Sequence, residues 1–133
     1  MGIFQQRIAI AATFEGPFRE LDAMVDTGSL YMWLPRRLLL EMRARPSATR
    51  QFMLADGTLI DRDVTEIVLR IDGQQVHTIC VFGDEGTSSL LGAVALEQLA
   101  LAVDPVNKRL VPMAQIPALS NGFPSPQRGR GLG

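Results

Sequence analysis

Residues 23–34 read Ala-Met-Val-Asp-Thr-Gly-Ser-Leu-Tyr-Met-Trp-Leu and place one carboxylate, Asp26, in a short polar loop between two apolar segments. The apolar flanks predict two strands, which would hold the loop on rigid supports. We therefore expect Asp26 at the exposed tip of a tight turn. The triplet Asp26-Thr27-Gly28 is weak evidence by itself, because chance produces it in roughly a few per cent of chains of this length.

The composition indicates one folded domain. The chain has 133 residues, of which 47% are hydrophobic and 20% are charged, values typical of a single globular unit. Residues 1–104 hold all 14 acidic residues and nine of the 13 basic ones. This acidic body argues against a nucleic-acid partner, which requires a basic surface. No apolar run approaches the roughly 18 residues of a membrane helix, so no membrane partner is expected.

Short apolar segments separated by Gly, Pro and Asp predict an all-β domain. Asp56-Gly57 and Asp72-Gly73 lie between apolar flanks and predict hairpin turns, and Gly16-Pro17 predicts a third reversal. Two short helices are expected over 36–43, beginning at Pro35 and ended by Pro46, and over 93–100. The expected strands are 3–13, 18–25, 30–34, 49–55, 58–70, 74–82, 88–91 and 109–112.

Two further features concern the compartment and the domain boundary. Cys80 is the only cysteine and cannot form an internal disulfide, so a reducing, cytoplasmic location is expected. After Met113 the sequence becomes rich in Pro and Gly and ends in Arg-Gly repeats. We therefore expect one domain over residues 1–115 and a flexible Pro/Gly/Arg tail over residues 116–133.

A second motif strengthens the interpretation of Asp26. Leu90-Leu91-Gly92 ends 64 residues beyond Gly28 and leads into an expected helix, with the Asp56-Gly57 hairpin between the two motifs. At these positions the sequence resembles the retropepsin-like aspartic proteases of clan AA, in particular the small prokaryotic single-domain members. The resemblance covers about residues 3–113 and rests on five ordered motifs, at Val25–Gly28, Leu54–Gly57, Leu90–Gly92, Ala95–Glu97 and Val103–Val106.

The resemblance implies an all-β, retropepsin-like closed barrel with one or two short helices that acts as a homodimer. It implies an aspartic endopeptidase that cleaves extended polypeptides, with Asp26 as the catalytic residue and no metal or organic cofactor. Thr27, Gly28 and Ser29 would support the active-site loop, with Thr27 bonding across the two-fold axis. The implied flap and substrate-binding residues are Met53, Leu54, Ala55, Asp56 and Gly57, and the implied second loop consists of Leu90, Leu91 and Gly92.

The physical chemistry of this interpretation requires two chains. A lone carboxylate is a poor catalyst, whereas two that share one proton act as base and acid toward a water and a carbonyl. The chain holds one such signature, so one Asp26 from each subunit would meet near a two-fold axis. We expect Ser29 to donate to the outer oxygen of Asp26 and favour its ionised form.

Other interpretations stay open at this level. Many viral members carry an acid and an arginine at the places held here by Leu30 and Ala93, so dimer support must differ. A fold can also keep a site it no longer uses, which leaves a catalytically silent dimerisation or peptide-binding module as the alternative function. A third, weaker possibility is an accessory nucleic-acid protein acting through its tail. The five arginines between positions 36 and 50, at 36, 37, 43, 45 and 50, are interpreted as a solvated charged face.

Overall fold

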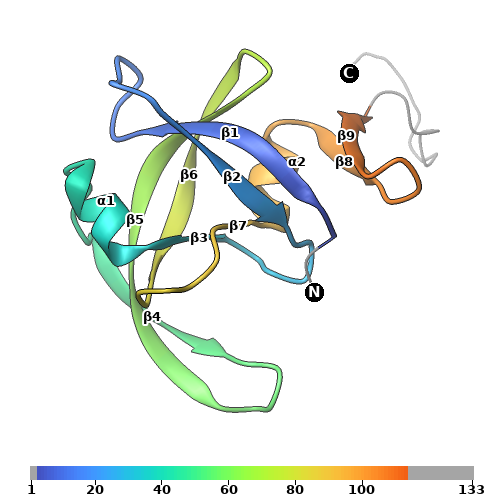
Figure 1. Ribbon diagram of the computed structural model, residues 1–133. Coiled ribbons are helices and arrows are strands. Elements are labelled where there is room, and N and C mark those ends of the chain that lie inside the picture. Colours follow the sequence, from blue (N-terminus) through green and yellow to red (C-terminus); the bar gives the residue numbers. More distant parts are fainter. Residues whose placement is uncertain (1–2, 114–133) are drawn as a thin grey trace, which may run out of the picture.

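The computed structural model describes residues 3–113 and is mostly β (Figure 1). This part of the chain forms nine strands and two short helices. The helices are α1 (Arg36–Glu41) and α2 (Ala93–Gln98). The strands are β1 (Gln5–Ala11), β2 (Arg19–Val25), β3 (Met32–Pro35), β4 (Ala48–Met53), β5 (Leu59–Ile71), β6 (Gln74–Gly83), β7 (Leu90–Leu91), β8 (Leu101–Asp104) and β9 (Arg109–Pro112).

Seven of these strands form one sheet in the order β1-β2-β7-β3-β6-β5-β4. Strand β1 pairs antiparallel with β2 through Gln5–Ile10, and its last residues, Ala9–Ala11, pair antiparallel with β5. Strand pairing therefore returns from β5 to β1, and β4 extends beyond this ring as the partner of β5 alone. Strands β8 and β9 form a separate two-stranded sheet.

The core lies inside this arrangement and is built from the apolar side chains of alternate strand positions. Ile10, Leu34, Ile67 and Phe82 come from four different strands and are almost completely buried. Both helices contribute to the same cluster. Leu39 comes from α1, Ala95 and Leu96 come from α2, and Leu99 directly follows α2. The burial of these groups supplies the main driving force for folding.

The cysteine of the chain belongs to this core. Cys80 is fully buried within β6. Burial raises the pKa of the Cys80 thiol, because the thiolate would lose its hydration. The group therefore behaves as a small apolar side chain.

Both predicted Asp-Gly hairpins are confirmed. Asp72 and Gly73 both have positive φ, 51° and 83°, and connect β5 to β6 with Ile71 opposite Gln74. A two-residue turn with left-handed dihedrals matches the twist of its flanking strands. At the other hairpin Gly57 has φ 86° and joins β4 to β5. The reversal at Gly16-Pro17 is also present, between β1 and β2.

The helix boundaries differ from the prediction. Pro35 is the last residue of β3 and the N-cap of α1 rather than its first helical residue. The helix ends at Glu41, well before Pro46, because Arg43 adopts φ 68° and the Ala44 N–H donates to the Leu39 carbonyl at 3.0 Å. This left-handed ending normally uses glycine, so the sequence carried no signal for it.

Strand β8 was not expected at all. The helix α2 ends at Gln98, two residues before the expected end at 100, and the chain reverses at Ala100, which has φ 54°, before the apolar residues 101–103 of β8. A non-glycine residue at such an angle is uncommon. Because alanine is not a typical turn residue, the sequence holds no signal for a turn before β8.

The predicted tail at residues 116–133 lies outside the described residues. None of the helices in the part of the chain that the structure describes is long and apolar enough to span a membrane.

Candidate active site

The Asp26 loop is anchored on a short strand from much later in the sequence. Strand β7 lies between β2 and β3, parallel to the first and antiparallel to the second. Met24 and Val25 at the end of β2 pair with Leu90 and Leu91 of β7. The Asp26 N–H continues this pairing by donating to the Leu91 carbonyl at 3.0 Å. The Leu90-Leu91-Gly92 motif therefore fixes the backbone of Asp26.

The turn itself orients the Asp26 carboxylate. The Gly28 N–H donates to Asp26 Oδ1 at 3.0 Å, and the Ser29 N–H donates to the Asp26 backbone carbonyl at 3.1 Å. These two bonds hold one carboxylate oxygen over the turn. Asp26 is half-buried, whereas Thr27 and Gly28 are exposed. The loop thus presents its polar tip at the surface of a rigid base.

Gly92 permits the far side of the loop to close. The Ala93 N–H donates to the Ser29 carbonyl at 2.8 Å, and the Val94 N–H donates to the Leu30 carbonyl at 3.0 Å. A Cβ atom on Gly92 would lie 2.5 Å from the Tyr31 carbonyl oxygen and 2.7 Å from that of Ser29. The φ of Gly92 is −95°, so the close approach of backbone, rather than a left-handed conformation, demands glycine here.

Ser29 plays a different part from the one expected. Its hydroxyl donates to the Tyr31 carbonyl at 2.8 Å. A hydroxyl has one proton, and a carbonyl can only accept, so that proton is committed to the backbone. The expectation that Ser29 donates to Asp26 is wrong for this structure, and Ser29 instead closes the turn that follows the carboxylate.

The members of the second loop differ in exposure. Leu90 is half-buried, and Leu91 and Gly92 are buried. Leu91 has no exposed surface and belongs to the core cluster. It therefore cannot line a substrate pocket in this conformation, and its contribution is to seat the loop.

The flap residues predicted from the sequence form the exposed tip of the β4–β5 hairpin, which projects from the body in Figure 1. Met53 and Leu54 expose 72% and 43% of their surface, a large apolar exposure for neighbouring residues. Ala55, Asp56 and Gly57 are exposed as well.

Asp56 stabilises the hairpin tip. Its Oδ1 accepts a hydrogen bond from the Thr58 N–H at 2.9 Å. Hydrogen bonds from the side chain and backbone of Thr58 hold the pKa of Asp56 below its ordinary value. The Asp56 carboxylate therefore stays ionised to a lower pH than an ordinary aspartate.

An aromatic cluster joins the hairpin to the Asp26 loop. The Phe52 ring of β4 lies 6.3 Å from the Tyr31 ring and 5.4 Å from the Trp33 ring, measured between centroids. Arg50 Nη1 donates to the Tyr31 hydroxyl at 2.9 Å, and the guanidinium lies over the same ring. These contacts set the angle at which the hairpin leaves the body.

This aromatic cluster was not predicted from the sequence. Tyr31 and Trp33 alternate along the segment after Gly28 and therefore share one face of it. That alternation was the available signal, but the distant partners Arg50 and Phe52 carry none of their own.

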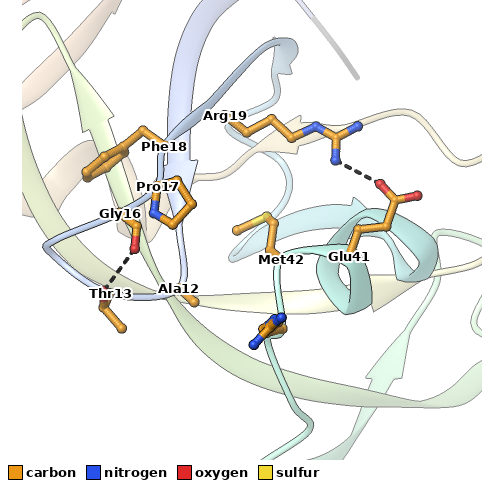
Figure 2. Close-up of a pocket in the computed structure, with 9 residues that line it drawn as sticks. Ala12, Thr13, Gly16, Pro17, Phe18, Arg19, Glu41 and Met42 are labelled. Carbon is orange, nitrogen blue, oxygen red and sulfur yellow. Dashed lines mark hydrogen bonds and ion pairs between the residues drawn. The ribbon is translucent and has the colours of Figure 1, made fainter.

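The described residues offer no metal site, and a cavity of the surface lies away from the Asp26 loop. Within residues 3–113 no cluster of three or more His, Cys, Asp or Glu side chains is suited to a metal ion. A cavity of about 710 Å³ lies between the β1–β2 turn and the end of α1, lined in part by Pro17 and Met42. Figure 2 shows it, together with the Arg19–Glu41 ion pair of 2.8 Å. None of its lining residues belongs to the candidate site.

Comparisons with known proteins agree with this architecture. No family model and no curated protein matches the sequence, but solved structures match the fold. The protease of simian foamy virus (mac) superposes with a TM-score of 0.50 at 19% identity, covering 71% of this chain and 94% of that one. EIAV protease, in complex with the inhibitor HBY-793, gives a TM-score of 0.54 at 17% identity, covering 72% and 86%. The chain has a retropepsin-like fold.

A bacterial structure is also similar. The retropepsin-like aspartic protease from Rickettsia conorii superposes with a TM-score of 0.48 at 19% identity, covering 76% of this chain and 86% of that one.

The role of Gly92 in this retropepsin-like fold can be tested by adding one methyl group. We expect Gly92→Ala to lower the free energy of unfolding by about 3 kcal/mol, because the methyl group meets rigid backbone. Gly73→Ala is the matched control, since Gly73 has open space and only its φ of 83° opposes a side chain, at a cost of about 1 kcal/mol. Denaturant unfolding of both variants measures the difference. Equal losses would contradict the steric role of Gly92.

Proposed function

We propose that this chain is one subunit of a homodimeric aspartic endopeptidase, in which Asp26 of each subunit lies beside the two-fold axis. The observation that carries the proposal is the double anchoring of the Asp26 loop, by Leu91 behind the carboxylate and by Gly28 in front of it. A carboxylate oriented by backbone groups on a rigid base is preorganised for chemistry. The retropepsin-like fold of the chain supports the same assignment.

In the proposed mechanism the two Asp26 carboxyl groups share one proton. The ionised carboxylate removes a proton from a water, whose oxygen attacks the carbonyl carbon of the scissile peptide bond. The protonated carboxyl donates its proton to the carbonyl oxygen, which forms a neutral tetrahedral diol. Collapse of the diol breaks the C–N bond: the protonated carboxyl donates its proton to the leaving nitrogen, one diol hydroxyl returns its proton to the other carboxylate, and the dyad again holds one proton. No metal or organic cofactor enters these steps.

Exposed apolar side chains support the proposed assembly. Leu30, in the loop after Ser29, exposes 57% of its surface, and Met53 and Leu54 are exposed at the hairpin tip. Such residues gain free energy when a second subunit or a substrate covers them. An extended polypeptide beneath the hairpin would add strand-like hydrogen bonds, and apolar pockets would select its side chains.

The lone buried thiol of Cys80 is compatible with the proposed reducing, cytoplasmic location.

The first prediction concerns the dimer. Sedimentation at micromolar concentration should give a mass about twice the 14.6 kDa of one chain. Leu30→Asp should weaken the dimer by about tenfold or more, because it would bury an unpaired charge at the interface. Leu40→Asp is the control, since Leu40 of α1 is comparably exposed at 50%. A wild-type monomer that cleaves peptides would contradict the assembly.

The second prediction concerns the carboxylate. Asp26→Asn should lower peptide cleavage by roughly a thousandfold or more, because an amide cannot accept a proton from water. The fold and the dimer should remain, as circular dichroism and sedimentation can show. Cleavage of an unbiased peptide library by both proteins provides the measurement. Absence of cleavage by the wild type would favour the silent peptide-binding module, and full activity of the variant would remove Asp26 from the mechanism.

The third prediction follows from the position of the Ser29 hydroxyl. Because that hydroxyl bonds the Tyr31 carbonyl, Ser29→Ala should leave the acid limb of the kcat/KM profile where the wild type has it. The variant should lose about 1 kcal/mol of stability with the hydrogen bond. Profiles from about pH 3 to pH 8, spanning the range in which carboxyl groups titrate, decide the question. A shifted acid limb would mean that Ser29 turns toward Asp26 in the assembled enzyme.

A further inference from the structure

Arg50 is an unusual residue for the inner side of the β4–β5 hairpin. Residues 50 and 52 of β4 share one face, because side chains alternate along a strand. This face is turned toward the Asp26 loop, since Phe52 contacts Tyr31 and Trp33 and Arg50 bonds the Tyr31 hydroxyl. A guanidinium is thus held beside the segment that carries the candidate catalytic carboxylate.

The charge of Arg50 has no acidic counterpart in the part of the chain that the structure describes. Within residues 3–113 no carboxylate forms an ion pair with Arg50. The β5 carboxylates Asp61 and Asp63 stand opposite Gln51 and Thr49 in the register, which places them on the other face of the hairpin. Asp63 is bonded there to Thr49 and to Arg36.

The residue directly opposite Arg50 is another arginine. Arg62 of β5 is the cross-strand partner of Arg50, and like charges in this position disfavour pairing of the strands. Asp84 bonds Arg62 Nη2 at 2.8 Å and offsets that one charge. Arg62 Nε is buried without a hydrogen-bond partner. Two guanidinium groups therefore share this face with one carboxylate.

The Tyr31 contact holds Arg50 in place without neutralising it. The phenol oxygen accepts one of the five guanidinium N–H groups, and the ring lies 5.7 Å below the guanidinium carbon. The remaining donors keep the planar fork that binds a carboxylate in bidentate fashion. Because the Arg50 side chain is already positioned, it would lose little rotamer freedom when an anion binds.

We propose that Arg50 selects substrates with a glutamate or aspartate side chain close to the scissile bond. This inference rests on the proposed function, since it names the substrate class of the same site. The acidic side chain would supply the missing carboxylate on the inner face of the hairpin. Arg50 is then a specificity-determining residue rather than part of a solvated charged face, and Tyr31 is the residue that positions it.

The test uses paired peptide libraries in which each position around the cleavage site holds Glu or its neutral isostere Gln. At pH 5.5 a glutamate side chain is ionised, since its ordinary pKa is about 4.3. The wild type should prefer Glu at one position by about five- to tenfold in kcat/KM, the range of an exposed to partly desolvated ion pair. Arg50→Met should reduce that ratio to about one. Arg50→Glu should reverse the preference, so that Gln is favoured over Glu at the same position, because like charges repel.

Arg45→Met is the matched control, because Arg45 is exposed and precedes β4. It should keep the wild-type Glu-to-Gln ratio. Tyr31→Phe, which removes only the anchoring hydroxyl, should lower the ratio part of the way. A wild type that cleaves without any Glu preference, or a preference that survives Arg50→Met, would overturn the inference and leave the protease assignment intact.

A binding measurement separates failure of the inference from failure of the proposed function. Asp26→Asn protein is titrated with fluorescent Glu and Gln peptide pools, and anisotropy reports their affinities. If the wild type cleaves nothing, tighter binding of the Glu pool that is lost with Arg50→Met still supports Arg50 as the selecting residue. Equal affinity for the two pools, with Arg50 present, would overturn the inference whether or not cleavage occurs.

Discussion

The insertion of β7 between β2 and β3 is the constraint on which the rest of the site depends. Two residues of strand, Leu90 and Leu91, connect segments that would otherwise be joined only by the Asp26 loop. The insertion succeeds because Gly92 allows the following helix to begin against the Ser29 and Tyr31 carbonyls. Three backbone hydrogen bonds from residues 26, 93 and 94 then span the contact. The carboxylate is thus positioned by main-chain geometry.

The sequence predicted the parts of this arrangement whose signals are local. Asp72-Gly73 formed the expected two-residue turn, and Asp56-Gly57 formed the expected hairpin tip, because left-handed dihedrals select these residues strongly. Strand β8 and the end of α1 were missed, since Ala100 and Arg43 adopt left-handed angles that their side chains disfavour. Tertiary packing overrode local preference at both positions.

The side-chain contacts of the site were beyond local reasoning. The bond from Ser29 to the Tyr31 carbonyl spans two residues, yet an Asp26 acceptor was equally compatible with the spacing. The contact between Arg50 and Tyr31 spans 19 residues and depends on how the hairpin is attached to the body. Sequence patterns indicate which face a residue occupies, but the partner on that face follows from the packing of two elements.

Departures from ordinary folding rules lie side by side at the hairpin and the Asp26 loop. In the body, apolar side chains fill the inside of the sheet, and surface arginines such as Arg7, Arg19 and Arg36 lie beside acids. The hairpin and the Asp26 loop depart from this pattern, with exposed Met53 and Leu30 and with Arg50 opposite Arg62. Such departures lower the stability of an isolated subunit and are expected where a protein meets its ligand or partner. Among residues 3–113, the exposed Met53 and Leu30 have no apolar surface against them and Arg50 has no carboxylate beside it. The proposed second subunit and the proposed acidic peptide would supply those two counterparts, which is why the same surface motivates both proposals.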